Sequence, residues 1–113
     1  MEDTPRHGPL TGLKVIELGH FVAAPFCTRL LGDLGADIIK IEPPGGDPVR
    51  QWGQHKNGHS PWWSMHGRNK RCITLDLKKP EARDVVLRLA AGSDALVAVS
   101  YTHLRAHETL RYL

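Results

Sequence analysis

The sequence predicts an α/β fold: a partial doubly wound, Rossmann-like parallel sheet with helices on both faces. Two apolar runs with β-branched residues, 14–18 and 37–41, flank a segment with helical spacing. An alternating run, 71–77, is followed by a second helical segment and another strand-like run from residue 94. Such strand–helix–strand units form parallel strands with a right-handed crossover, so the order β-α-β-loop-β-α-β indicates one open sheet.

The first unit begins with the strand Lys14-Val-Ile-Glu-Leu18, which Gly12 and Gly19 bound. Pro25 suits the first turn of a helix, where its missing N–H would have no intrahelical partner. Gly35 stands where a helix C-cap usually lies, and Asp37-Ile-Ile-Lys-Ile41 reads as the next strand. The apolar positions of the predicted helix are Phe26, Leu30, Leu31 and Leu34.

Residues 47–69 predict a long ordered loop with a helical turn near 62–66, because Gly, Asn, Pro and His interrupt every regular pattern. In the strand 71–77, Ile73, Leu75 and Leu77 share one face. A second helix is predicted to start at Pro80 and to end before Gly92. Its expected apolar face consists of Val85, Val86, Leu89 and Ala90.

Composition favours a small globular domain or a fragment of one, with 113 residues, 41% hydrophobic residues and a net charge of +3. The mild basic balance fits a small phosphate-bearing ligand as well as an ordinary solvated surface. Basic residues are not interleaved with aromatic ones, so nucleic acid is not an expected partner. Without an apolar leader or a membrane-length apolar run, the chain is expected to be cytoplasmic with no membrane partner. Cys27 and Cys72 are expected to be buried, reduced thiols.

The junction Gly19–Pro25 is the first candidate site. It joins the carboxyl end of a strand to the N-terminus of a helix, where N–H groups and the helix dipole favour an anion. No dinucleotide or P-loop glycine motif is present, and a simple tight turn remains the alternative. Lys78 after the third strand could meet a phosphate, although an exposed lysine needs no function. For Glu42, a solvated carboxylate is favoured over a ribose ligand.

A metal site is not expected. The pairs His55/His59 and His103/His107 have four-residue spacing but lack the accompanying Glu of a zinc-protease helix. No catalytic arrangement of Ser, His and Asp or of Cys and His follows from the spacing.

Several ordered motifs over about Leu10 to Val97 resemble the start of the class III CoA-transferases. This family includes formyl-CoA transferase, carnitine CoA-transferase and α-methylacyl-CoA racemase. The motifs are Pro9-Leu-Thr-Gly-Leu-Lys-Val-Ile-Glu-Leu18, Ala24-Pro-Phe-Cys-Thr-Arg-Leu-Leu-Gly-Asp-Leu-Gly-Ala-Asp-Ile-Ile-Lys-Ile-Glu-Pro43, Gly46-Asp-Pro-Val-Arg50 and Asn69-Lys-Arg-Cys-Ile-Thr-Leu-Asp-Leu-Lys78.

The resemblance implies the N-terminal part of a CoA-transferase large domain and an interlocked homodimer in the full-length protein. In this family an aspartate attacks the acyl-CoA thioester, and CoA passes through an enzyme thioester to an acceptor acid. It also implies a CoA or acyl-CoA substrate and no metal. Pro43 offers no basic side chain at a position where related transferases have one. The implied CoA contacts are His20, Val22, Ala23, Leu75, Asp76, Leu77 and Lys78.

Three segments are expected: a polar leader at 1–9, the family segment at 10–97, and a tail at 98–113 that departs from the family. We expect that the tail is not biological and that no residue here corresponds to the nucleophilic aspartate. The chain is therefore predicted to be inactive, and to expose apolar faces and a strand edge when alone. The long 47–68 loop favours a transferase, while a racemase fragment and a non-catalytic CoA- or nucleotide-binding module remain alternatives. The acyl donor and acceptor acid are not indicated.

Overall fold

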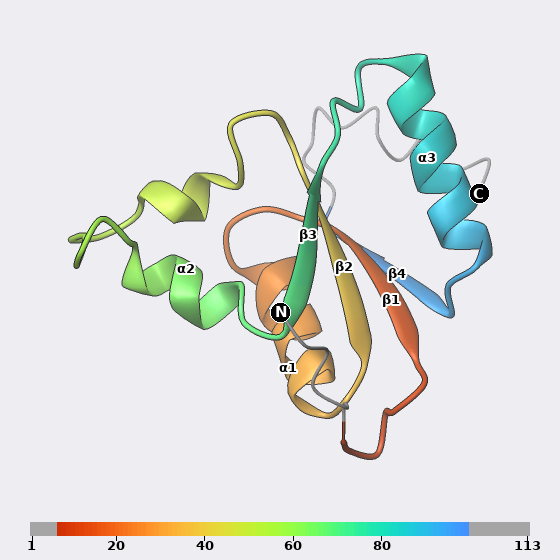
Figure 1. The fold of residues 1–113 in the computed structure, drawn as a ribbon, viewed down its shortest axis with the longest axis horizontal. Helices are drawn as coiled ribbons and strands as arrows, with labels where there is room; N and C mark the ends of the chain where they lie inside the picture. The colour runs from red at the N-terminus through yellow and green to blue at the C-terminus, as the bar shows by residue number, and fades with distance from the viewer. Residues whose placement is uncertain (1–6, 100–113) are drawn as a thin grey trace.

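The computed structural model describes residues 7–99, which form a four-stranded parallel sheet in the order β3-β2-β1-β4. This confirms the predicted α/β fold and its parallel sheet. Helix α1 connects the neighbouring strands β1 and β2, whereas α3 connects β3 and β4, which lie at opposite edges of the sheet (Figure 1). The elements are β1 Lys14–Leu18, α1 Ala23–Asp33, β2 Asp37–Glu42, η1 Pro48–Gln51, α2 Pro61–His66, β3 Lys70–Thr74, α3 Pro80–Ala91 and β4 Ala95–Ala98.

The two faces of the sheet differ in chemistry because neighbouring residues of a strand point to opposite sides. On the face toward α3, Ile16, Ile41 and Val86 form a buried apolar cluster. On the face toward α1, Val15 and Ile38 are buried near the amino ends of the strands. At the carboxyl ends, the same face carries charged side chains. This half-charged face underlies the candidate site.

Helix α1 packs on the sheet through a different side from the one predicted. Its buried residues include Ala24, Thr28 and Gly32, whereas Phe26, Leu30 and Leu34 are 42%, 44% and 46% exposed. A side chain at Gly32 would press on Asn69 and Ile38, so small residues let the helix approach the sheet closely. Most of the large apolar residues that predicted the helix therefore form an exposed stripe.

Strand β3 is shorter than predicted, since it ends at Thr74 instead of Leu77. Leu75 and Leu77 nevertheless pack with Ile73 on the α3 face of the sheet, so the predicted alternation holds beyond the strand. In α3 the expected apolar face is only partly correct. Val86 is 2% exposed, whereas Val85 is 36% exposed and points away from the core.

The long segment between β2 and β3 is ordered by two short helices, η1 and α2, which project to one side of the sheet (left in Figure 1). Helix α2 contains the predicted helical turn, and the Ser60 hydroxyl caps it by accepting a hydrogen bond from the Trp63 N–H. Arg50 lies over the Trp63 ring, 3.7 Å from its centroid. The loop is therefore anchored by contacts within it.

Both cysteines were predicted to be buried, and that is wrong: Cys27 and Cys72 are free and exposed. Ala98 ends β4 and pairs with Leu18, whereas residues 100–113 of the predicted tail lie outside the described part of the chain. Within residues 7–99, no helix has the length and apolar character that crossing a bilayer requires.

Candidate functional site at the carboxyl edge of the sheet

The β1–α1 turn brings the strand end and the helix N-terminus very close together. A Cβ on the buried Gly19 would overlap the Cβ of Ala24, so only glycine fits there. Phe21 has a φ of +64°, a left-handed conformation that costs about 1–2 kcal/mol for a residue with a side chain. No side chain caps the helix at Val22, and no acidic residue lies in its first turn. The turn thus leaves the positive end of the helix dipole available to an anion.

The segment after β3 lies at the same edge of the sheet. The Leu75 N–H donates to the Glu42 carbonyl (2.9 Å), which keeps the chain alongside β2. The Asp76 carboxylate then accepts a hydrogen bond from the Lys78 N–H (3.1 Å) and closes a local turn. This turn leaves the Lys78 side chain exposed immediately before α3.

The structure places both groups of sequence-predicted residues at the carboxyl edge, because all four strands run parallel. They lie at the ends of β1 and β3, with the end of β2 between them, and lead into helices on opposite faces (Figure 1). Ligands of open α/β sheets bind in the crevice outside this edge. Val22, Ala23 and Lys78 are exposed there, whereas Leu75 and Leu77 pack into the core cluster and could offer a ligand mainly their backbone.

Glu42 was expected to be a solvated carboxylate, and this prediction is wrong. It is 3% exposed and accepts hydrogen bonds from Arg50 Nε (2.7 Å), Arg50 Nη2 (2.6 Å) and the Asp47 N–H (2.8 Å). Burial opposes ionisation, but the guanidinium and the backbone donor outweigh it and lower the pKa of Glu42 to about 2. This ion pair joins the end of β2 to η1.

Sequence reasoning missed a buried network of charges beneath the β1–α1 turn. Lys40 Nζ lies 2.7 Å from Glu17 Oε1 and 2.8 Å from Asp47 Oδ2, and Lys70 Nζ lies 2.8 Å from Glu17 Oε2. All four side chains are at most 1% exposed. The Thr28 hydroxyl adds a hydrogen bond to Glu17 Oε2 (2.7 Å). The two negative and the two positive charges neutralise each other, and such pairing is required when charged groups are buried in a protein.

A signal for this network exists in the sequence. Glu17 and Lys40 each interrupt an otherwise apolar strand, and a charge in a buried strand requires a partner. Burial alone would lower the pKa of Lys40, but the Glu17 and Asp47 carboxylates outweigh it and raise that pKa. For Lys70, burial dominates and lowers the pKa despite the nearby Glu17.

His20 lies between the network and the surface of the turn. Burial lowers its pKa below the ordinary value, although the Asp47 carboxylate opposes this effect. The neutral ring is therefore the dominant form at pH 7. The next residue, Phe21, packs its ring against Trp52 in a tilted arrangement with 5.3 Å between centroids, and its N–H donates to Asp47 Oδ1 (3.4 Å).

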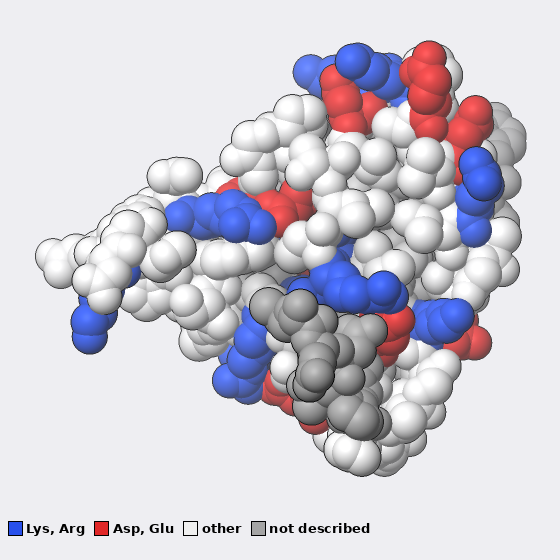
Figure 2. Space-filling model, in the orientation of Figure 1, with Lys and Arg blue, Asp and Glu red and all other residues white. Residues whose placement is uncertain are grey.

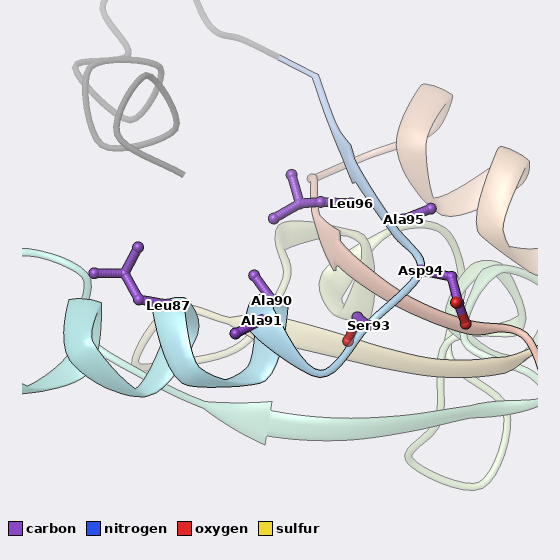
Figure 3. A pocket seen from close by; sticks show the side chains of 7 residues that line it. All are labelled: Leu87, Ala90, Ala91, Ser93, Asp94, Ala95 and Leu96. Atoms are coloured by element: carbon purple, nitrogen blue, oxygen red, sulfur yellow. The ribbon is translucent and has the colours of Figure 1, made fainter.

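Other surface features do not compete with this site. A hollow of about 430 Å³ lies at the opposite end of the sheet, where the chain passes from the end of α3 to the start of β4 (Figure 3). Its lining includes Leu87, Ser93 and Leu96. In the described range, no cluster of three or more His, Cys, Asp or Glu side chains could hold a metal ion. On the face in view, basic and acidic side chains lie next to each other instead of forming one basic surface (Figure 2).

Comparison with known proteins identifies close relatives. The sequence model of CoA-transferase family III matches residues 10–107, a range that runs past Val97. The chain is 50% identical over 91 residues to succinyl-CoA–D-citramalate CoA-transferase of Chloroflexus aurantiacus, covering 79% of this chain and 23% of the relative. Human succinyl-CoA:glutarate CoA-transferase is 42% identical, with 79% and 21% covered. A CaiB/BaiF family protein from Brucella suis superposes with a TM-score of 0.78 at 36% identity, covering 93% of this chain and 28% of that protein.

Proposed function

The chain belongs to CoA-transferase family III, and from this premise we propose that its carboxyl edge is half of a CoA-binding site. The chain spans about a quarter of the length of the relatives that it matches. The proposed activity of the whole protein is transfer of CoA from an acyl-CoA donor to a carboxylic acid. The proposed contacts are His20, Val22, Ala23, Leu75, Asp76, Leu77 and Lys78.

The observation that carries this proposal is the uncapped N-terminus of α1 at the carboxyl end of β1. CoA is rich in phosphate groups, and a helix N-terminus without an acidic residue or a side-chain cap favours an anion. Lys78 supplies an exposed point charge at the same edge, from the end of β3. The low pKa of His20 keeps a neutral, hydrogen-bonding ring beside the turn.

Three acids at this edge are unsuited to the nucleophilic step. Glu17, Glu42 and Asp47 are buried and held in ion pairs. A carboxylate that attacks a thioester must reach the carbonyl carbon and must be free of such partners. We therefore propose that the nucleophile is a carboxylate other than these three buried acids.

The named relatives narrow the substrates to test. Their names contain succinyl-CoA as the CoA donor and D-citramalate or glutarate as the acceptor. All three acids have two carboxylates, so we propose a dicarboxylate acceptor and a dicarboxylic acyl-CoA donor for the whole protein. This proposal concerns the acyl group and the acceptor acid, and it rests on the named relatives, not on the described residues.

Binding of CoA to the 113-residue chain tests the half-site. Intrinsic tryptophan fluorescence reports on it, because Trp52 contacts Phe21 of the turn. Lys78→Gln removes one exposed charge and should weaken CoA binding up to about fivefold, since a single solvent-exposed ionic contact contributes at most about 1 kcal/mol. Lys14→Gln is the matched control, since Lys14 is also exposed but starts β1 at the opposite end of the sheet.

The outcomes separate the hypotheses clearly. CoA binding that weakens with Lys78→Gln and with added salt, but not with Lys14→Gln, supports the proposed site. Equal weakening by both lysine variants would indicate nonspecific attraction to a basic surface. No measurable binding of CoA at millimolar concentration would contradict a half-site in this chain.

A further inference from the structure

The buried charge network is connected to the backbone of the β1–α1 turn at three points. Lys40 Nζ donates to the Gly19 carbonyl (2.9 Å), and Lys70 Nζ donates to the Pro25 carbonyl (2.8 Å). Between them, the Phe21 N–H donates to Asp47 Oδ1 (3.4 Å). The beginning, middle and end of the turn are therefore each tied to a charged side chain below it.

Lys40 has the central place in this network. Its ammonium group donates hydrogen bonds to Glu17 and to the Gly19 carbonyl, and it forms an ion pair with Asp47. Asp47 extends the connection, because Oδ2 meets Lys40 while Oδ1 accepts from Phe21 and Val49. Lys40 and Asp47 thus fix a carbonyl and an N–H that lie two residues apart in the turn.

The turn needs such support, because Phe21 adopts the unfavourable left-handed conformation. Well-packed apolar residues would fill the same space with equal or better stability, so buried ion pairs are weak evidence for a purely stabilising role. Here the polar donors and acceptors are directed at the turn backbone. At 1% exposure or less, neither side chain can touch a ligand in the crevice.

We propose that Lys40 and Asp47 are positioning residues that hold the β1–α1 turn in the shape that receives CoA. This inference rests on the proposed function of the turn. Neither residue contacts CoA; each acts through the backbone of Gly19 or Phe21. Loss of either residue loosens the turn before it affects the sheet, which has its own apolar core on the opposite face.

Hydrogen exchange of the whole chain, followed by mass spectrometry of its peptides, distinguishes positioning from general stabilisation. In Asp47→Ala, amides of residues 19–26 should exchange at least tenfold faster, while those of residues 37–41 in β2 stay near the wild-type rate. Asp47→Asn keeps an acceptor for the Phe21 N–H and should give a smaller acceleration. Asp37→Asn is the matched control, because Asp37 pairs with Arg71 at the amino end of β2 and should leave the turn unchanged.

Titration with CoA completes the test. The positioning role predicts at least fivefold weaker CoA binding by Asp47→Ala, with partial recovery in Asp47→Asn. Equal acceleration of turn and strand amides would show a merely structural role and overturn the proposal, as would unchanged CoA affinity in Asp47→Ala. If Asp47→Ala does not fold, the same comparison is made with Asp47→Asn. If the unsubstituted chain binds no CoA, the proposed function fails, and exchange in the turn alone decides the positioning role.

Discussion

Replacing Glu42 by Gln removes the negative charge that Arg50 holds with two hydrogen bonds of 2.7 and 2.6 Å. The pKa of Glu42 falls from the ordinary 4.5 to about 2 in the fold. One pKa unit corresponds to 1.36 kcal/mol, so this difference represents about 3 kcal/mol of folding free energy at neutral pH. Such a value is a large part of the stability of a small domain.

The contribution has a defined pH dependence. Because the folded-state pKa lies below the unfolded one, the stabilisation is complete above about pH 4.5. It declines as the pH falls toward 2, where the carboxyl group becomes protonated in the folded chain as well. The free-energy difference between wild type and Glu42→Gln should therefore be about 3 kcal/mol at pH 7 and should shrink steadily between about pH 5 and 2.

Urea unfolding followed by tryptophan fluorescence at pH 7, 5, 4 and 3 measures this difference. With an m-value of about 1–3 kcal/mol/M, the midpoint at pH 7 should move by about 1–3 M urea. Asp33→Asn is the control, because it removes an exposed ion pair with Arg68 and should cost less than about 1 kcal/mol. A cost for Glu42→Gln below 1 kcal/mol at pH 7, or one that is constant down to pH 3, would refute the assigned ion pair.

Three further predictions concern packing. Gly19→Ala places a Cβ against that of Ala24, so it should destabilise the chain by about 1–3 kcal/mol and abolish CoA binding. Wild-type stability and CoA binding in this variant would show that the turn has another shape. Ile16→Ala, at a fully buried position, should lower the free energy of unfolding in urea by about 2–5 kcal/mol. The control Leu30→Ala, on the exposed stripe of α1, should lower it by less than about 1 kcal/mol. Leu30→Lys should reduce self-association of the isolated chain in light scattering, whereas an unchanged particle size would mean that the stripe does not drive it.

Much of the fold could be predicted because it depends on local patterns. The β-branched runs at 14–18 and 37–41, the helical spacing between them and Pro80 at the start of α3 each act over one element. The parallel sheet then follows from crossover geometry. The common position of the two candidate CoA segments at the carboxyl edge was predictable for the same reason, since parallel strands all end on one side.

The charged face of the sheet was not predictable in the same way. Glu42 looked like a solvated residue at a strand end, yet the chain returns at Arg50 to cover it. Cys72 shares its strand with the core residue Ile73 but is exposed, and β3 is an edge strand of the sheet that residues 7–99 form. Both outcomes depend on which distant segment packs over a given strand.

By itself, the sequence determined the order and type of the elements, the family to which the chain belongs and the two segments proposed to contact CoA. Periodicity and turn chemistry are local, and the family motifs are linear, so neither needs coordinates. Only the tertiary structure decided that Lys40 joins Glu17, Asp47 and Gly19, and that the apolar stripe of α1 faces outward. A buried charge acquires its partners, and a helix its buried side, only when the crossovers stack strands and loops that are distant in the chain.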